Sequence, residues 1–310
     1  MKILFKYIKY FLKEDFRLIT YLPVIIYIFI CITINYYFDF EHKILDKHVG
    51  TLKGFIFFFV FYGLAYFPVA IYVLSINKKQ HVLKKSGFWI KTIFIIALLA
   101  GSAFFSFYKD IIDLYTDLSE RYLIRKILIN SRNFLIFLLP LLFFWYFLKP
   151  SKSGFLWIKL RGFNPRPYFY ILLIMLPIIF IASFSNDFLN TYPTFKPWTI
   201  NIVFGLEKWQ MAGIYEIFYG LDFITVEMIF RGALVLGLYK LLGKDCILPM
   251  ISVYCFLHFG KPMGEAVSSI FGGYILGIIA INTESIVGGS MVHMGVAWMM
   301  EVFAYSQHGL

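Results

Sequence analysis

Three consecutive apolar runs in the C-terminal part of the chain contain ionisable side chains. The run LDFITVEMIFRGALVL carries Glu227 and Arg231 four residues apart, SVYCFLHFG carries His258, and GGSMVHMGVAWMM carries His293. An ionisable group at bilayer depth costs a few kcal/mol or more to bury, so it is by default a candidate functional residue. We therefore predict a single polar site to which all three segments contribute.

These side chains are suited to hydrolysis. A carboxylate and an imidazole can hold and deprotonate a water molecule, while a second imidazole donates to a developing oxyanion. Two neutral imidazoles and a carboxylate also form a common zinc shell with one open position, so Glu227, His258 and His293 are equally candidate ligands of a divalent metal such as zinc. Arg231, one turn from Glu227, would pair with it or with another carboxylate and lower the cost of burial.

The residues around these groups resemble the three signature motifs of a known family. VEMIFRG at 226–232, YCFLH at 254–258 and VHMGVA at 292–297 are similar, in order and spacing, to the motifs of the CAAX protease and bacteriocin-processing (Abi-type) intramembrane proteases. The resemblance covers roughly residues 210–305. It implies a multi-span endopeptidase, often labelled a metalloprotease, that cleaves a membrane-associated or lipid-modified peptide. It also implies catalytic Glu227, His258 and His293, with Arg231 and Tyr254 supporting them.

The chain departs from the family pattern at two polar positions. The first motif of the family begins with two glutamates, and the one usually assigned as the base is replaced here by Val226. Neighbouring residues on a helix point about 100° apart, so Glu227 cannot take that role without rotation of the helix. The third motif has Ala297 where the family has Asn or Asp. The alternative reading is therefore a catalytically impaired relative that acts as a binding, immunity-type or scaffold protein.

Other carboxylates could compensate. Glu265 lies near the expected start of the helix after His258, where the helix dipole favours a carboxylate, and we take it as a supporting site residue. The same position suits a purely structural first-turn glutamate. Glu301 is about 12 Å along the helix from His293, too far to replace a side chain at 297. Asp222 is expected to face a different side of its helix.

Structural roles remain open for the same residues. Glu227 and Arg231 can be read as an intrahelical ion pair, and each histidine as a hydrogen-bonding partner of a neighbouring helix. A small proton-coupled transporter is a third reading. It is disfavoured because the two halves of the chain show no matching broken helices.

The elements that must position these residues are membrane helices. The chain of 310 residues is 60% hydrophobic and 21% aromatic, with a mean hydropathy of +0.74, which indicates an all-α polytopic transmembrane bundle. We predict eight or nine spans, with the short run at 246–259 a candidate broken helix. The expected spans are 18–38, 54–76, 88–108, 132–148, 168–185, 213–239, 246–259, 265–282 and 285–304.

Composition divides the chain into two regions. Residues 1–166 form an N-terminal membrane region of about four spans, whose first 17 residues are basic and amphipathic and suit an interfacial helix. Residues 167–310 form the protease-like membrane domain. The segment 150–167 is predicted to be a cytoplasmic connector, because it concentrates Pro, Gly and Ser beside basic residues.

Charge indicates the partners and the orientation. The net charge of +11 comes mainly from basic residues in loops and at helix ends, which favours anionic membrane lipids as partners rather than nucleic acid. Positive charge near the first span predicts a cytoplasmic N-terminus, and with the family resemblance it suggests a bacterial inner membrane. The basic residues that support this orientation are Lys2, Lys6, Lys9, Lys13, Arg17, Lys78, Lys79, Lys84, Lys85, Lys149, Lys152, Lys159, Arg161 and Arg166.

Overall fold

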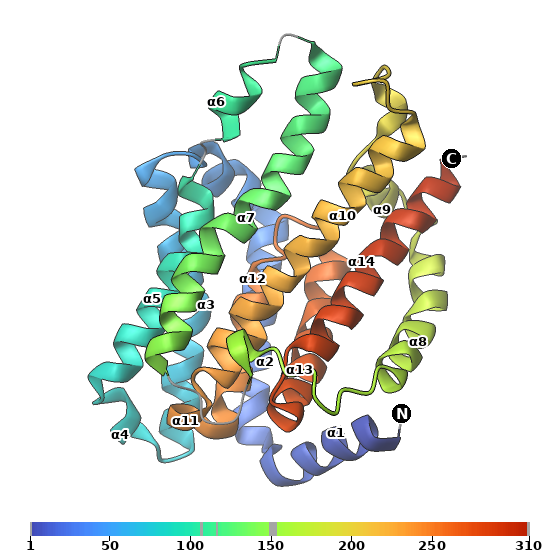
Figure 1. The fold of residues 1–310 in the computed structure, drawn as a ribbon. Helices are drawn as coiled ribbons and strands as arrows, with labels where there is room; N and C mark the ends of the chain where they lie inside the picture. The colour runs from blue at the N-terminus through green and yellow to red at the C-terminus, as the bar shows by residue number, and fades with distance from the viewer. Residues whose placement is uncertain (1, 106–107, 116, 149–153, 309–310) are drawn as a thin grey trace. The chain divides into compact units, whose positions relative to one another are not determined.

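The computed structural model describes residues 2–105, 108–115, 117–148 and 154–308. Within these ranges every regular element is helical (Figure 1), apart from an isolated bridge between Val203 and Leu206. The predicted all-α class is therefore confirmed. Lys149, Lys152 and the start of the predicted connector lie outside the described residues.

Five of the described helices are long and apolar enough to cross a membrane, by length and composition. An α-helix satisfies its own backbone hydrogen bonds, which is the requirement for a segment surrounded by hydrocarbon. The five are α2 (Leu18–Phe38), α3 (Leu52–Ile76), α5 (Ser86–Phe104), the apolar part Leu118–Phe147 of α7 (Leu118–Leu148), and α13 (Met263–Thr283). A membrane-embedded protein is thus supported, while the larger count of eight or nine spans stays a prediction.

The other predicted runs are also helical, but shorter or interrupted. α8 (Arg166–Ala182) is an apolar helix below full span length. The run at 213–239 comprises α10 (Lys208–Glu227) followed directly by a π-helix, η5 (Met228–Leu236). The short run at 246–259 gives α12 (Ile247–Phe256), ten residues or about 15 Å long. The last run is α14 (Val287–Gln307).

Shorter elements connect these helices. The first is α1 (Lys2–Asp15), so the basic N-terminal segment is a helix as predicted. The remaining short α-helices are α4 (Gln80–Leu83), α6 (Tyr108–Ile112), α9 (Asn186–Thr191) and α11 (Tyr239–Leu242). A second π-helix, η1, covers Glu41–Leu45, and 3₁₀ turns cover Asp46–His48, Phe155–Trp157, Pro197–Thr199 and Gly243–Cys246.

Contacts group the chain into two compact units. Unit 1 comprises 1–105, 140–163 and 228–289, and unit 2 comprises 106–139, 164–227 and 290–310. One boundary between the two units lies between α10 and η5, directly after Glu227. Each unit contains segments from both sides of residue 166. These units are defined by contacts, and the division at residue 166 that composition predicts stays a prediction.

Unit 1 is built around α12. All ten of its residues are buried, and it packs against α3 and α13, while α3 also packs along α5 (Figure 1). The short helix therefore forms the core of the unit instead of a lipid-facing surface. The π-helix η5 contacts both α12 and α13.

The predicted connector is part of this core. Trp157 is fully buried, and its indole lies against Gly232, where an added Cβ would be 2.5 Å from the ring. Ile286 donates a backbone hydrogen bond to the carbonyl of Trp157. Residues 154–160 are therefore packed against η5 and the start of α14, and Gly232 is required for the close approach of the tryptophan.

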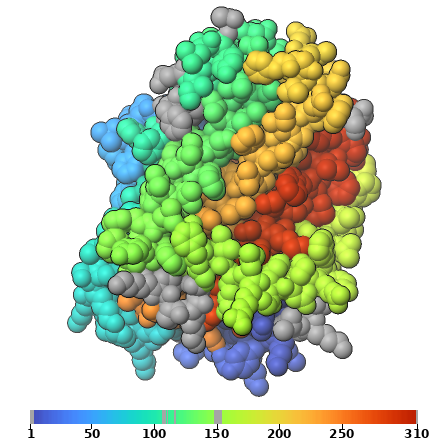
Figure 2. Space-filling view, viewed as in Figure 1, coloured from blue at the N-terminus to red at the C-terminus, as the bar shows by residue number. Residues whose placement is uncertain are grey.

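Unit 2 contains α8, α9, α10, α14 and most of α7. α10 and α14 lie side by side (Figures 1 and 2), and Trp298 of α14 packs on Gly220 of α10, where an added Cβ would be 2.5 Å from the ring. The Trp298 indole also donates to the carbonyl of Glu216 at 3.0 Å. On the other side of α14, Gly295 packs against Leu172 of α8. Small residues thus bring neighbouring helices close together, as is common in membrane bundles.

Candidate functional site

The close packing of α10 and α14 joins two of the predicted site residues. Glu227 is the last residue of α10 and is fully buried. Its Oε1 lies 3.1 Å from Nδ1 of His293 in α14, whose side chain is 13% exposed. The ring of Phe223, one turn before Glu227, packs on the imidazole at 4.5 Å between centroids. Unit 2 therefore contains a buried carboxylate and imidazole pair.

This contact defines one tautomer of His293 when Glu227 is ionised. An ionised carboxylate can only accept hydrogen bonds, so Nδ1 of His293 donates to Glu227. In the neutral imidazole Nε2 is then the unprotonated nitrogen. A carboxylate in this arrangement orients the ring, stabilises the imidazolium form and strengthens Nε2 as a base or as a metal ligand.

His258 lies in unit 1, in the turn that follows α12. Its Nδ1 is 2.7 Å from the carbonyl oxygen of Tyr254, one turn earlier. A carbonyl only accepts, so Nδ1 is again protonated and Nε2 is again the acceptor. A neutral His258 therefore presents the same type of nitrogen as His293, and it can donate from Nε2 only when it is protonated.

Arg231 and Tyr254 pack against each other in unit 1. Arg231 lies in η5 and is fully buried, with its guanidinium 4.4 Å from the centroid of the Tyr254 ring. The same ring packs edge-on against Phe230 at 4.9 Å and His258 at 4.7 Å. Tyr254 therefore connects the cation of the first motif to the histidine of the second. The predicted pairing of Arg231 with Glu227 is between residues of different units and stays a prediction.

The turn that carries His258 is held by residues that the sequence analysis did not select. Asn35, 4% exposed, donates to the carbonyl of Phe259 at 3.0 Å and accepts from the amide of Glu41 at 3.1 Å. The Tyr36 hydroxyl lies 2.7 Å from the carbonyl of Lys261 and 3.3 Å from that of His258. An asparagine beside a tyrosine near the end of an apolar run was the available sequence signal for this role.

The two positions that depart from the family pattern have different environments. Val226 is half-buried, whereas Ala297 is buried, 4% exposed. Glu227 and Val226 therefore present different faces of α10, in agreement with the expectation from helix geometry. Neither apolar side chain provides a polar group for chemistry.

The structure places the three carboxylates that were considered as substitutes for the missing polar groups. Glu265 is in the first turn of α13, as predicted. Asp222 accepts a hydrogen bond from Asn133 of α7 at 3.0 Å. Glu301, 1% exposed, accepts from the amide and the hydroxyl of Thr194 at 3.0 and 2.7 Å. Asp222 and Glu301 thus tie elements of unit 2 together.

Glu216 is a half-buried glutamate that the sequence analysis missed. Its carboxyl group interacts with that of Glu301, and the Tyr305 hydroxyl approaches its Oε1 at 3.5 Å. Tyr215 and Thr194 share a hydroxyl hydrogen bond of 2.7 Å beside this pair. A second glutamate inside a predicted span was the available signal. The cluster anchors the loop around Thr194 to α10 and α14.

The described residues do not form a ready zinc site. No group of three or more His, Cys, Asp or Glu side chains that could hold a metal ion occurs in the part of the chain that the structure describes. A catalytic zinc takes three protein ligands, whereas the joined pair of Glu227 and His293 supplies two, with one carboxylate oxygen already accepting from the imidazole. The observed arrangement fits a carboxylate-oriented imidazole better than a metal shell.

Comparison with models of known protein families, with curated proteins and with solved structures found no match. The family resemblance therefore rests on the three motifs alone.

Proposed function

We propose that this membrane protein is an intramembrane peptidase-like hydrolase of the CAAX protease type, in which Glu227 and His293 form a water-activating pair. The observation that supports this proposal is the buried hydrogen bond between Glu227 Oε1 and His293 Nδ1 at 3.1 Å. The substrate class is a membrane-associated or lipid-modified peptide, as the motif resemblance implies.

The proposed chemistry uses Nε2 of His293. This nitrogen accepts a proton from water as the oxygen attacks the peptide carbonyl, and the same proton then passes to the departing amine. Glu227 keeps the ring in the required tautomer and stabilises the transient imidazolium. Glu227 is therefore a positioning residue for His293, which agrees with its place as the second glutamate of the motif.

His258 is assigned to the same reaction by the motif resemblance. With Nδ1 donating to the carbonyl of Tyr254, its neutral ring offers Nε2 as an acceptor. This nitrogen can accept a hydrogen bond from water, and only the protonated form of His258 would donate to an oxyanion. Arg231 and Tyr254 support the position of this ring.

The alternative function is a non-catalytic binding or immunity-type membrane protein. It is favoured by Val226 and Ala297, because both positions carry polar groups in the family motif and apolar groups here. This reading retains the polar residues as a binding or packing site and omits the cleavage step.

Comparing peptide termini in membrane fractions tests the proposal for any membrane-protein substrate. Cells lacking the protein would be complemented with the wild type, Glu227→Gln, His293→Gln, or the control Glu207→Gln at an exposed position. We expect new termini in membrane proteins with the wild type and the control, reduced by about 10²-fold or more in the two site variants. Termini that are the same in all strains would overturn the peptidase proposal and favour the binding reading.

A further inference from the structure

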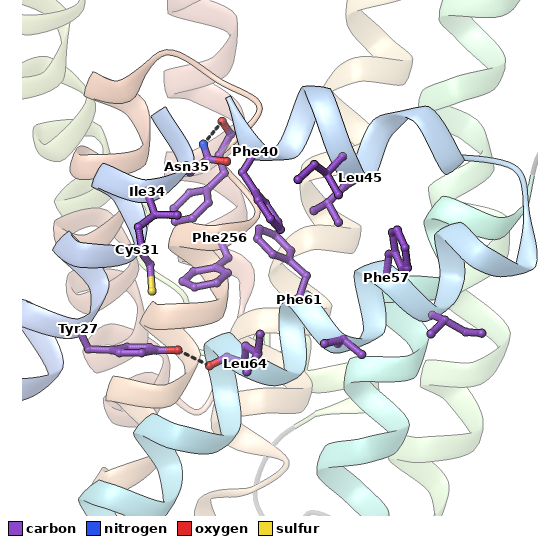
Figure 3. Close-up of a pocket in the computed structure, with 14 residues that line it drawn as sticks. Tyr27, Cys31, Ile34, Asn35, Phe40, Leu45, Phe57, Phe61, Leu64 and Phe256 are labelled. Atoms are coloured by element: carbon purple, nitrogen blue, oxygen red, sulfur yellow. Dashed lines mark hydrogen bonds between the residues drawn. The ribbon is translucent and has the colours of Figure 1, made fainter. Parts of the chain in front are cut away.

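Unit 1 contains an apolar cavity of about 430 Å³ (Figure 3). Most of the residues that line it are far from the motifs in sequence, and the exceptions are Phe256 of α12 and Phe259 in the turn after it. This volume is in the range of pockets that hold a small molecule, about 300 to 1,000 Å³. The lining residues on α2 and α3 are Tyr27, Cys31, Ile34, Asn35, Ile56, Phe57, Val60, Phe61 and Leu64, with Phe40, Ile44, Leu45, Phe256 and Phe259 completing the wall.

The polar groups of the lining are already bonded to the protein. The Tyr27 hydroxyl donates to the carbonyl of Leu64 at 2.7 Å (Figure 3). The Asn35 amide donates to the carbonyl of Phe259 and accepts from the amide of Glu41. An occupant would therefore meet hydrocarbon and aromatic surfaces, which suit an apolar chain better than a polar metabolite.

The cavity borders the lipid-facing side of two membrane helices. Ile34 of α2 and Val60 and Leu64 of α3 line it and are 46%, 52% and 55% exposed, on helices long and apolar enough to span. From Tyr27 to Ile34 the lining extends about 10 Å along α2, less than half of a hydrocarbon core about 30 Å thick. The cavity therefore belongs to one leaflet, the one next to the corner at residues 39–53.

Positive charge remains at this corner after the local ion pairs are formed. Asp39 pairs with Lys43 at 3.8 Å, and the Asp46 carboxylate is hydrogen-bonded to the ring of His42 at 2.8 Å. Lys47 is exposed and forms no ion pair with any described carboxylate. Lys53 lies 5.3 Å from the ring centroid of Phe57, a cavity residue.

Glu41, the third carboxylate of the corner, faces the protein. It accepts a hydrogen bond from the amide of Gly260. The lysines at the end of the cavity thus complement an anionic headgroup.

We propose that this cavity binds one acyl chain of an anionic phospholipid from the adjoining leaflet, with the headgroup phosphate held near Lys47 and Lys53. The site is separate from the proposed hydrolytic function and does not depend on it. Its inner wall includes Phe256 and Phe259, which precede and follow His258 in the chain, so a bound chain supports the turn that carries this histidine.

Photo-crosslinking in vesicles tests the proposal. The full-length protein would be reconstituted in phosphatidylcholine vesicles containing a minor fraction of phosphatidylglycerol with a diazirine in one acyl chain. Crosslinked peptides would then be mapped. Ile34→Trp fills the cavity, and Ile30→Trp, one turn earlier and 53% exposed, is the matched control outside the lining. Val60→Trp is a second filling variant from α3.

We expect crosslinks at 27–35 and 56–64 that fall at least about fourfold in both filling variants, the factor that corresponds to one displaced methylene, and that persist in Ile30→Trp. The double variant Lys47→Gln/Lys53→Gln should reduce labelling by phosphatidylglycerol but not by an equivalent phosphatidylcholine probe. Uniform labelling of the lipid-facing positions, with no difference between Ile34→Trp and Ile30→Trp, would overturn the proposal. It would show that the probe is only part of the lipid shell around the protein. Equal labelling by both probes in the wild type would overturn the headgroup assignment.

Discussion

Glu227 and His293 are 66 residues apart in the sequence, and their side chains are hydrogen-bonded at 3.1 Å inside unit 2. This contact depends on the close packing of α10 and α14, where Trp298 covers Gly220. A buried carboxylate that has no such partner would be strongly destabilising. The contact therefore gives the buried carboxylate of Glu227 a hydrogen-bond partner, and the carboxylate holds the ring of His293 in its orientation.

If the proposed function holds, a carboxylate at position 226, where the resembled motif has one, should raise activity. In Val226→Glu, the new side chain extends from a half-buried face of α10, which is not the face that carries Glu227. The added carboxylate supplies a general base, which typically raises the rate about 10² to 10⁴-fold. Cleavage would be followed through the peptide termini described above. Ile224→Glu is the control, because it adds the same charge on another face of α10. Equal termini in Val226→Glu and the wild type would contradict a catalytic role for this position.

The packing of α10 on α14 should be sensitive to one methyl group. Gly220→Ala places a Cβ 2.5 Å from the Trp298 ring, so we expect it to lower stability by about 1 to 3 kcal/mol, as for other overpacked sites. Gly213→Ala on the same helix meets no atom within 4 Å and should be neutral or slightly stabilising. Thermal unfolding in detergent would measure both. If the two variants melt at the same temperature, the proposed close packing is wrong.

The sequence predicted the helices well because each apolar run has the length and composition of a membrane helix. The run at 18–38 coincides with α2, and the short run at 246–259 is indeed a short helix, α12. The change from α10 to a π-helix at Met228 was not predicted, and neither was the packing of Trp157 on Gly232 within this π-helix. Local hydrophobic periodicity contains no signal for this change.

The motifs selected some of the residues that the structure brings into contact, while their catalytic role stays a prediction. The motifs identified Glu227 and His293, which the structure joins, and Tyr254, which contacts His258 and Arg231. They could not identify Asn35 and Tyr36, since these residues act through backbone carbonyls more than 200 positions away in sequence. Such contacts are set by the tertiary fold, and no local pattern encodes them.

The stacking of Arg231 on Tyr254 should depend on the aromatic ring and not on its hydroxyl group. At 4.4 Å from the ring centroid, a desolvated guanidinium gains about 2 kcal/mol from the contact. Lysine lacks the planar group that stacks, so Arg231→Lys should be destabilising. In a double-mutant cycle on thermal stability, Tyr254→Leu should couple to Arg231→Lys, whereas Tyr254→Phe should not. Similar coupling for both tyrosine variants would be evidence against stacking.

Stability should fall with rising pH because of Glu41. Burial, and secondly the charge of Asp46, raise the pKa of Glu41 from 4.5 to about 8 in the corner outside the membrane helices. The folded state then binds more protons than the unfolded state in this interval, so the stability from neutral Glu41 is complete below pH 4.5 and is lost as pH rises to about 8. Unfolding temperatures across this range would measure the slope.

Glu41→Gln should flatten that slope, because the amide stays neutral at every pH in the range. Asp39→Asn, which removes an exposed carboxylate in the same corner, should leave it unchanged. A slope that persists in Glu41→Gln would assign the pH dependence to another group.

The most direct test of the account is the tautomer of His293, measured by ¹⁵N NMR of histidine-labelled protein in lipid nanodiscs. The chain has six histidines, and His293→Gln would assign the signal. We predict a ring protonated at Nδ1 with an unprotonated Nε2, and a change toward the other tautomer in Glu227→Leu. A ring protonated at Nε2 that does not respond to Glu227→Leu would contradict the carboxylate and imidazole pair on which the proposed function rests.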